Sequence, residues 1–176
     1  VLLQLDGNII LTDPVFSRRA SPLPFLGPQR KTPPVLSVEQ LHQLDAVVIS
    51  HNHYDHLDDA TIRRILKRFP DVCCFVPLGL ADWFRRRGAK RVVELDWWQS
   101  FTWQGMTLTA VPAQHWSMRT PWNRNRSLWC GWVIEGRHHR FWFSGDTGYS
   151  PELLLIPERL GQIDAAALPI GAYAPR

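Results

Sequence analysis

The stretch His51-Asn52-His53-Tyr54-Asp55-His56 follows directly after the apolar run Ala46-Val47-Val48-Ile49. It places three imidazoles and one carboxylate within six residues, behind what reads as a short buried strand. Imidazole and carboxylate groups are the ligands that zinc and other borderline divalent metals prefer. The alternative is a polar loop exposed to solvent, but such a loop has no need of this pattern. The stretch therefore predicts a metal site at the end of a strand.

The spacing of these side chains says what kind of backbone carries them. On a helix, His51 and His53 would point about 200° apart. In a strand, His51, His53 and Asp55 would share one face and His56 would take the other. No regular element brings all four to one metal. A loop leaving a strand can serve two metals, with His51 and His53 on one and Asp55 and His56 on the other.

Two further candidate ligands also follow predicted strands. His115 comes shortly after the apolar run 106–111, and Asp146 comes shortly after the run 140–144. Both strands could end beside the first loop, and Gly145 next to Asp146 allows a tight turn there. We expect the remaining histidines to be solvated, on a helix surface or in a hairpin turn: His42, His138 and His139.

The rest of the chain alternates hairpins with strand–helix–strand units, which favours mixed sheets with helices outside over a doubly wound sheet. The expected strands are 1–5, 9–11, 45–50, 72–76, 91–95, 99–103, 106–111, 128–135, 140–144 and 163–169. The expected helices are a short one at 37–40, one at about 59–69 capped by Asp58 or Asp59, one at 80–87 ended by Gly88, and one starting at Ser150-Pro151. The segments 13–34, with six prolines, and 112–126 are expected to be irregular.

The composition fits one soluble globular domain. Its 176 residues are 45% hydrophobic and 20% charged, and no apolar run approaches the roughly 18 residues that span a bilayer. The three cysteines, Cys73, Cys74 and Cys130, are odd in number and lack disulfide or zinc spacing. We read them as buried core residues and expect a cytoplasmic location.

The chain is basic, with a formal net charge of +4 and a pI of about 9.3. Much of the excess lies between residues 63 and 91, where it indicates either solvated helix faces or attraction to an anionic partner such as lipid headgroups or RNA. Four tryptophans lie among arginines in the segment 115–132. Some of them belong to the core, and the remainder would suit a ligand with an anionic head and an apolar body.

The pattern H-x-H-x-D-H after an apolar strand, then a lone histidine, then a glycine-flanked aspartate resembles the metallo-β-lactamase superfamily. Further strings are similar to the N-acylphosphatidylethanolamine-hydrolysing phospholipase D group and its bacterial relatives: Leu11-Thr12-Asp13-Pro14-Val15-Phe16, Ser144-Gly145-Asp146-Thr147-Gly148-Tyr149 and Leu168-Pro169-Ile170-Gly171-Ala172-Tyr173. The resemblance implies the α/β (α+β) class, with a single four-layer αββα metallo-β-lactamase sandwich over residues 1–176.

The resemblance also implies a ligand set for two zinc ions. His51, His53 and His115 would hold the first zinc. Asp55 and His56 would hold the second, with Asp146 bridging the two. The family expects one more histidine on the second zinc, beyond Tyr173, and a strand with a Gly-His segment before Val1. We therefore expect a fragment that is incomplete at both ends, and two zinc ions in the full-length protein.

Three residues receive other roles. Tyr54 would face the substrate, Asp13 would steady the histidine loop, and Asp55 would orient a zinc-bound hydroxide or relay a proton. The sequence shows no serine or cysteine nucleophile arrangement, which favours direct attack by water.

The expected activity is zinc-dependent, phospholipase D-like phosphodiester hydrolysis of N-acylphosphatidylethanolamine or a related lipid, with peripheral contact at a membrane surface. The alternatives are a lactonase or esterase of the ascorbate-6-phosphate lactonase-like type, a nuclease, and a non-catalytic binding protein. No RNA-binding arm is visible, so no nucleic-acid partner is expected. The ligand string argues against a purely binding role.

Overall fold

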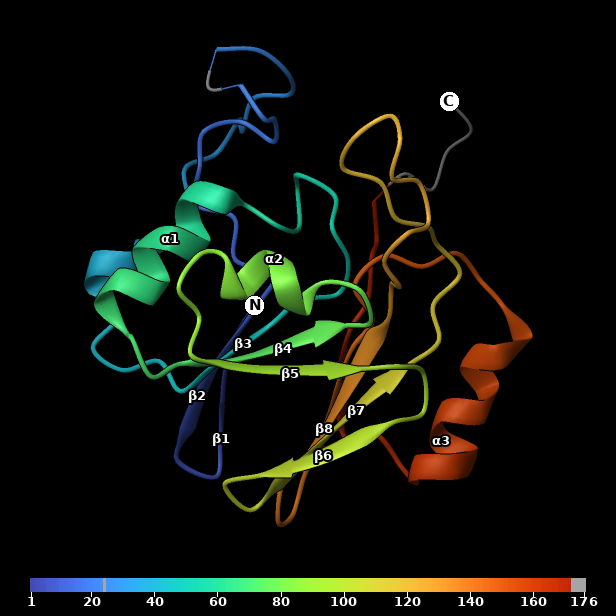
Figure 1. Cartoon of the computed structure of the whole chain (residues 1–176). Coiled ribbons are helices and arrows are strands. Elements are labelled where there is room, and N and C mark those ends of the chain that lie inside the picture. Colours follow the sequence, from blue (N-terminus) through green and yellow to red (C-terminus); the bar gives the residue numbers. More distant parts are fainter. Residues whose placement is uncertain (24, 172–176) are drawn as a thin grey trace.

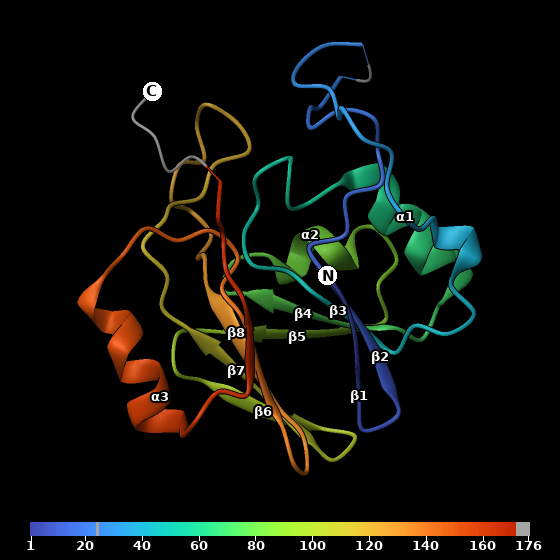
Figure 2. The same cartoon turned by 180° about the vertical axis from the view of Figure 1, so that it is seen from behind.

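A computed structural model describes residues 1–23 and 25–171. Two five-stranded sheets pack face to face, and helices cover their outer faces (Figures 1 and 2). The predicted four-layer αββα sandwich is confirmed. Within the described residues, no helix is both long and apolar enough to cross a membrane.

The first sheet has the order β1-β2-β3-β4-β5. Its strands are β1 (Leu2–Leu5), β2 (Asn8–Thr12), β3 (Ala46–Val48), β4 (Cys73–Pro77) and β5 (Arg91–Leu95). β1 and β2 form the predicted antiparallel hairpin, because Asp6 and Gly7 both adopt positive φ angles in its two-residue turn. The other neighbours pair in parallel.

The second sheet has the order β10-β9-β8-β7-β6. Its strands are β6 (Ser100–Trp103), β7 (Met106–Val111), β8 (Gly131–Glu135), β9 (Arg140–Phe143) and β10 (Ala165–Ala167). All pair antiparallel except β10, which is parallel to β9. The predicted strand 163–169 is shorter than expected at both ends, and Pro169, just beyond it, has no N–H to extend the ladder.

Helices α1 (Asp59–Arg68) and α2 (Ala81–Arg85) cover the first sheet. Asp58 caps α1 by accepting a hydrogen bond from the N–H of Ala60, as predicted. α2 is shorter than the predicted 80–87, because the N–H groups of Arg87 and Gly88 bond three residues back and tighten the chain into a turn. A single 3₁₀ turn, Val38–Gln40, stands at the predicted short helix.

The outer face of the second sheet carries α3 (Leu155–Leu160), which continues a 3₁₀ turn at Pro151–Leu154. Ser150 caps that turn and Pro151 follows in its first position, as the sequence predicts.

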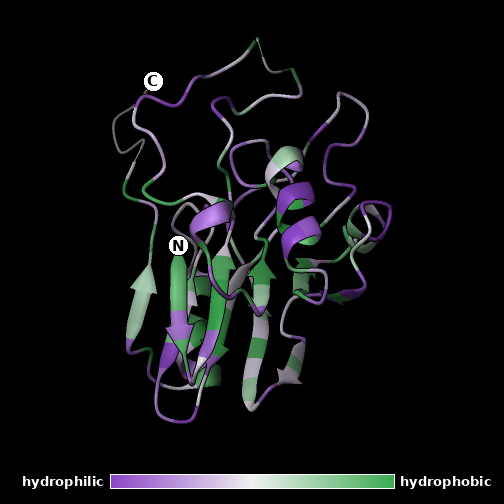
Figure 3. Cartoon of the chain, turned by 90° about the vertical axis from the view of Figure 1, so that its left-hand side faces the viewer, coloured by the Kyte–Doolittle hydropathy of each residue, from purple (hydrophilic) through white to green (hydrophobic). Residues whose placement is uncertain are grey.

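Apolar side chains fill three interfaces, and the strands are green along most of their length in Figure 3. Neighbouring residues of β4 face opposite layers, so Cys73 packs between the sheets while Cys74 faces the helices. All three cysteines are buried and unpaired within the described residues, so the structure agrees with their reading as core residues.

The fold brings four loops to one end of the sandwich. β2 and β3 point toward this end in one sheet and β7 and β9 do so in the other, and the loops that follow them meet there (Figures 1 and 2). Each of these loops carries a residue that the sequence singled out as part of a metal site.

Candidate metal centre

Three imidazoles converge from two of these loops. The Nε2 atom of His51 lies 2.8 Å from Nδ1 of His53, which lies 3.3 Å from Nε2 of His115. The three nitrogens all lie within 4.8 Å of one another, the geometry in which one cation can accept all three lone pairs. His51 is buried and the other two are half-buried.

The surroundings keep these rings neutral and oriented. Burial first, and then the neighbouring imidazoles, hold the pKa of His51 far below its usual range, and burial also lowers the pKa of His53 and His115. The hydroxyl of Ser50 lies 2.9 Å from Nδ1 of His51. Since that hydroxyl donates to a carboxylate, it accepts from Nδ1–H and leaves the Nε2 lone pair facing the cluster.

A second group lies beside the three histidines. Nε2 of His56 is 3.1 Å from Oδ2 of Asp146, and that same oxygen is 3.8 Å from Nε2 of His115. Asp146 therefore stands between His56 and the three-histidine cluster, where a bridging carboxylate would lie. Asp55 Oδ2 is 3.8 Å from His56 Nε2, but the Asp55 side chain is 65% exposed and less constrained.

Asp13 supports both groups. Its Oδ2 accepts hydrogen bonds from the hydroxyl of Ser50, at 2.5 Å, and from Nδ1 of His56, at 2.6 Å, and its Oδ1 accepts from the N–H of Ser50. Asp13, His51 and His56 also have ligand atoms close enough for a metal, but these contacts already occupy the Asp13 oxygens. We therefore read Asp13 as an acceptor that orients histidines.

The pKa of His56 reflects this arrangement. Burial would lower it, but hydrogen bonds to Asp13 and Asp146 outweigh burial and raise the pKa of His56 to about 10. The hydrogen bond from His56 in turn lowers the pKa of Asp146. A cation at Nε2 of His56 would take the position of the proton that now faces Asp146, while Asp13 would still accept from Nδ1–H. The donor set of these two groups therefore fits a metal centre.

Two aromatic residues flank the histidines. The ring of Trp116 meets that of His53 edge-on, with centroids 4.4 Å apart. Tyr54 lies between the candidate ligands in sequence, and its hydroxyl donates to the carbonyl of Arg119 at 2.9 Å.

Sequence reasoning did not single out Ser50 or Arg119 for such contacts. Ser50 could have been noticed beside His51, whereas nothing local marks Arg119.

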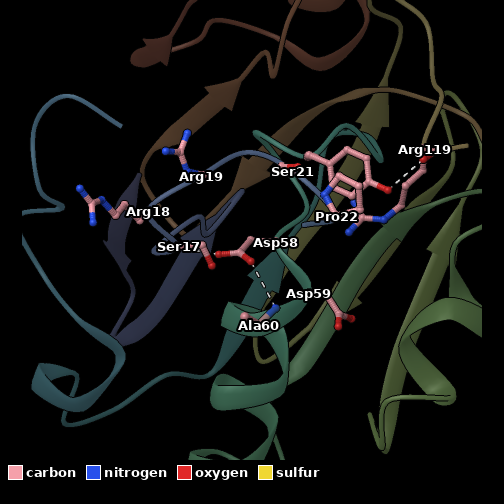
Figure 4. A pocket seen from close by; sticks show the side chains of 10 residues that line it. Ser17, Arg18, Arg19, Ser21, Pro22, Asp58, Asp59, Ala60 and Arg119 are labelled. Carbon is pink, nitrogen blue, oxygen red and sulfur yellow. Dashed lines mark hydrogen bonds between the residues drawn. The ribbon is translucent and has the colours of Figure 1, made fainter. Parts of the chain in front are cut away.

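Two cavities adjoin the histidine loop. A groove of about 450 Å³ runs past His53, Tyr54 and Asp55. Its other lining residues are mostly apolar: Ala20, Pro28, Trp116, Met118, Arg119, Thr120 and Pro121. A second pocket of about 320 Å³ lies under the 13–34 segment, and Figure 4 shows Arg119 well apart from Arg18 and Arg19 within it.

The remaining sequence features divide between core and surface. Trp132 is fully buried and Trp122 is 78% exposed, so the tryptophans do split as expected. In the basic segment 63–91, five cations pair with carboxylates: Arg63 and Arg87 with Asp59, Arg64 with Glu39, Arg85 with Asp82, and Lys90 with Asp71. This favours solvated helix faces over an anion-binding surface.

Comparison with known proteins agrees with the family resemblance seen in the sequence. The family model for the β-lactamase superfamily domain matches residues 8–176. An N-acyl-phosphatidylethanolamine-hydrolyzing phospholipase D of Caenorhabditis elegans is 45% identical over 186 aligned residues, which include 100% of this chain and 52% of that protein. The chain thus spans about half the length of this curated relative.

Two solved structures share the fold. A possible metal-dependent hydrolase from Veillonella parvula has a TM-score of 0.71 at 21% identity, covering 90% of this chain and 63% of its own. CmlA, a diiron β-hydroxylase from Streptomyces venezuelae, has a TM-score of 0.69 at 24% identity, covering 94% of this chain and 31% of its own.

Proposed function

Because this chain belongs to the β-lactamase superfamily, we propose that it forms the metal-binding part of a hydrolase acting on a phosphodiester bond of N-acylphosphatidylethanolamine or a related lipid. The observation that carries the proposal is the convergence of His51, His53 and His115 beside the His56–Asp146 pair. The name of the C. elegans relative supports the substrate class.

We propose zinc as the metal, because neutral imidazoles are common zinc ligands and because hydrolysis requires no redox change at the metal. His51, His53 and His115 would hold one ion. His56 and Asp55 would contribute to a second position, with Asp146 shared between the two. Divalent ions there supply Lewis acidity toward a phosphoryl oxygen and lower the pKa of bound water.

Other residues around the centre would handle the substrate and its proton. Asp55 is exposed and close to His56, so its carboxylate is free to orient the attacking water and accept a proton from it. The groove beside Asp55 runs between Trp116, Met118 and Pro121, which offer apolar contact to an acyl chain. Tyr54 lines the same groove and would contact the substrate there.

The loops around the groove support a lipid surface as the place of reaction. No aspartate or glutamate occurs between Pro14 and Val38 or between Trp97 and Ile134. The first segment instead carries Arg18, Arg19, Arg30 and Lys31, and the second carries the exposed Arg124 and Arg126. Cations on loops that contain no carboxylate of their own attract anionic headgroups, by about 1 kcal/mol for each residue near the surface.

Exposed apolar side chains stand on the same two loops. Phe25 is 75% exposed, Leu26 61% and Trp122 78%. Both loops rise at the end of the sandwich where the metal ligands lie, and apolar colour marks the tip of the first (Figures 1 and 3). Apolar tips flanked by cations suit insertion among lipid headgroups, which makes these loops better candidates for membrane contact than the ion-paired segment 63–91.

The test uses the full-length protein with elemental analysis and three substrates: N-acylphosphatidylethanolamine in vesicles, a water-soluble phosphodiester and a lactone. We expect close to two zinc ions per chain and fastest turnover of the vesicle lipid. Turnover should rise with anionic lipid and fall in about 1 M salt, where the Debye length is about 3 Å. Absence of metal after mild purification would refute the metal centre. Activity confined to the lactone would refute the lipid substrate but not the metallohydrolase.

A further inference from the structure

Arg119 joins the two loops that carry the three-histidine cluster. It lies four residues after His115, and its Nη1 group donates to the carbonyl oxygens of Asn52, at 3.0 Å, and Leu57, at 2.6 Å. These two carbonyls bracket residues 53–56, which hold three of the candidate ligands. One guanidinium nitrogen thus spans the base of the histidine loop from the side of His115.

Tyr54 completes the connection from within the histidine loop. The guanidinium carbon of Arg119 lies 4.1 Å above the centre of the Tyr54 ring, and the Tyr54 hydroxyl donates to the Arg119 carbonyl. Trp83 of α2 offers a further aromatic face, 5.4 Å away. Side chain and main chain of Arg119 are therefore both engaged with the segment between His53 and Asp55.

Removing the Arg119 guanidinium from water costs free energy, which indicates that the placement of this side chain has a purpose. Burial lowers the pKa of its guanidinium, and among the described residues no carboxylate lies within 4.0 Å of it. A partly buried cation without a direct ion-pair partner is unfavourable unless polar or aromatic groups replace water. Here the two carbonyls and the Tyr54 ring serve that purpose, and they all belong to the segment 52–57.

We propose that Arg119 is a positioning residue for the metal centre: it fixes the separation between the loop of His51 and His53 and the loop of His115. The inference rests on the proposed metal centre. Lysine cannot replace arginine fully, because an ammonium group lacks the planar fork and stacks less well on tyrosine. Methionine keeps much of the side-chain volume and removes the polar contacts of the side chain, while the main-chain carbonyl that accepts from Tyr54 remains.

Arg68, the last residue of α1, provides a matched control. It also donates to a main-chain carbonyl, that of Leu41 at 3.1 Å, and its guanidinium lies 5.5 Å from the Phe69 ring. It therefore makes the same kinds of contact as Arg119 without touching either metal-binding loop. Arg68→Met should report what such contacts contribute to stability alone.

The experiment compares Arg119→Met, Arg119→Lys, Tyr54→Phe and Arg68→Met in the full-length protein. Affinity for Zn²⁺ and Co²⁺ is measured by chelator competition, together with the visible absorption of bound Co²⁺ and thermal unfolding of the metal-free form. Since residues that orient ligands typically change metal affinity 10- to 100-fold, we expect about that loss for Arg119→Met. Arg119→Lys and Tyr54→Phe should lose less, and Arg68→Met should bind metal like the wild type.

The outcomes separate this inference from the proposed function. Unchanged metal affinity and Co²⁺ absorption in folded Arg119→Met would overturn the positioning role while leaving the hydrolase proposal intact. Equal losses in Arg119→Met and Arg68→Met would show a general stability effect and would also overturn it. If Arg119→Met fails to fold, the same criteria apply to Arg119→Lys and Tyr54→Phe. A wild-type protein that binds neither metal would instead refute the metal centre itself.

Discussion

The histidine loop, residues 51–57, and the proline-rich loop, residues 14–34, are neighbours at one end of the sandwich but are built in opposite ways. The histidine loop is held through Asp13, Ser50 and Arg119, and most of its side chains are buried or half-buried. The tip of the proline-rich loop carries the exposed side chains of Phe25 and Leu26.

The difference follows from what each loop is proposed to bind. A metal accepts ligands only within narrow limits of distance and angle, so the groups around its ligands must be fixed. A lipid surface is deformable, and an apolar tip with nearby cations can meet it in many arrangements. Changes in the histidine loop should therefore have large effects on any substrate. Changes in the proline-rich loop should have small effects limited to membranes.

The largest effect is expected for Asp146→Ala, which removes the carboxylate between His56 and His115. Turnover should fall by about 10³-fold or more on every substrate, because bound metals contribute several kcal/mol to transition-state stabilisation. Steady-state kinetics and circular dichroism would check that activity is lost while the fold persists. Unchanged turnover would remove Asp146 from the site.

A smaller but still general effect is expected for Asp13→Asn. The amide has one acceptor oxygen in place of two, so it cannot accept from the Ser50 N–H and also from the Ser50 hydroxyl and His56, and metal affinity or turnover should fall about 10- to 100-fold. Asp45→Asn is the matched control, because Asp45 also accepts a main-chain hydrogen bond, from Ile9, but lies outside the metal-binding loops. Equal metal affinity in the two variants would contradict the supporting role of Asp13.

The histidine loop should also leave a pH signature in the metal-free protein. The pKa of His56 is raised to about 10, so its contribution to stability is fully present below about pH 6.5 and is lost as the pH rises toward 10. His51, His53 and His115 have lowered pKa values, so they favour the folded state above about pH 6.5 and oppose it as the pH falls.

Urea unfolding of the metal-free protein between pH 5 and 10 would measure both pH dependences, because this range extends on both sides of the usual histidine pKa of about 6.5. Above that pKa lies the alkaline branch, where His56 loses its proton, and below it lies the acid branch, where the other three histidines oppose folding. Asp13→Asn should flatten the alkaline branch, because His56 then loses a carboxylate partner. An alkaline branch that is identical in wild type and variant would show that the Asp13–His56 contact does not set this dependence.

The smallest effect is expected for the double variant Phe25→Ser, Leu26→Ser. Turnover of lipid in vesicles should fall by up to about tenfold, the equivalent of about 1.4 kcal/mol, because less apolar surface enters the membrane. Turnover of a soluble substrate should stay the same, and the free energy of unfolding should change by no more than about 0.5 kcal/mol. Equal loss of turnover on both substrates would contradict the proposed difference between the two loops.

Local patterns along the sequence were sufficient for much of the fold. Alternation of apolar residues, the Asp6-Gly7 turn and the cap at Asp58 each act over a few residues, so strands and α1 appear where expected. The ends of α2 and β10 were less predictable, because they depend on how the last turns and edges meet their surroundings. The string 168–173 can be followed only to Gly171, since Ala172 and Tyr173 lie outside the described residues.

The sequence by itself determined the identity of the candidate ligands, because imidazole and carboxylate side chains in H-x-H-x-D-H suit few other purposes. Only the tertiary structure decided how they are grouped and held. His115 reaches His53 across 62 residues of sequence, and Asp13 reaches His56 across 43. The contact of Arg119 with Asn52 spans 67 residues. Such contacts depend on which strand ends share an edge of the sandwich, and no local spacing records that.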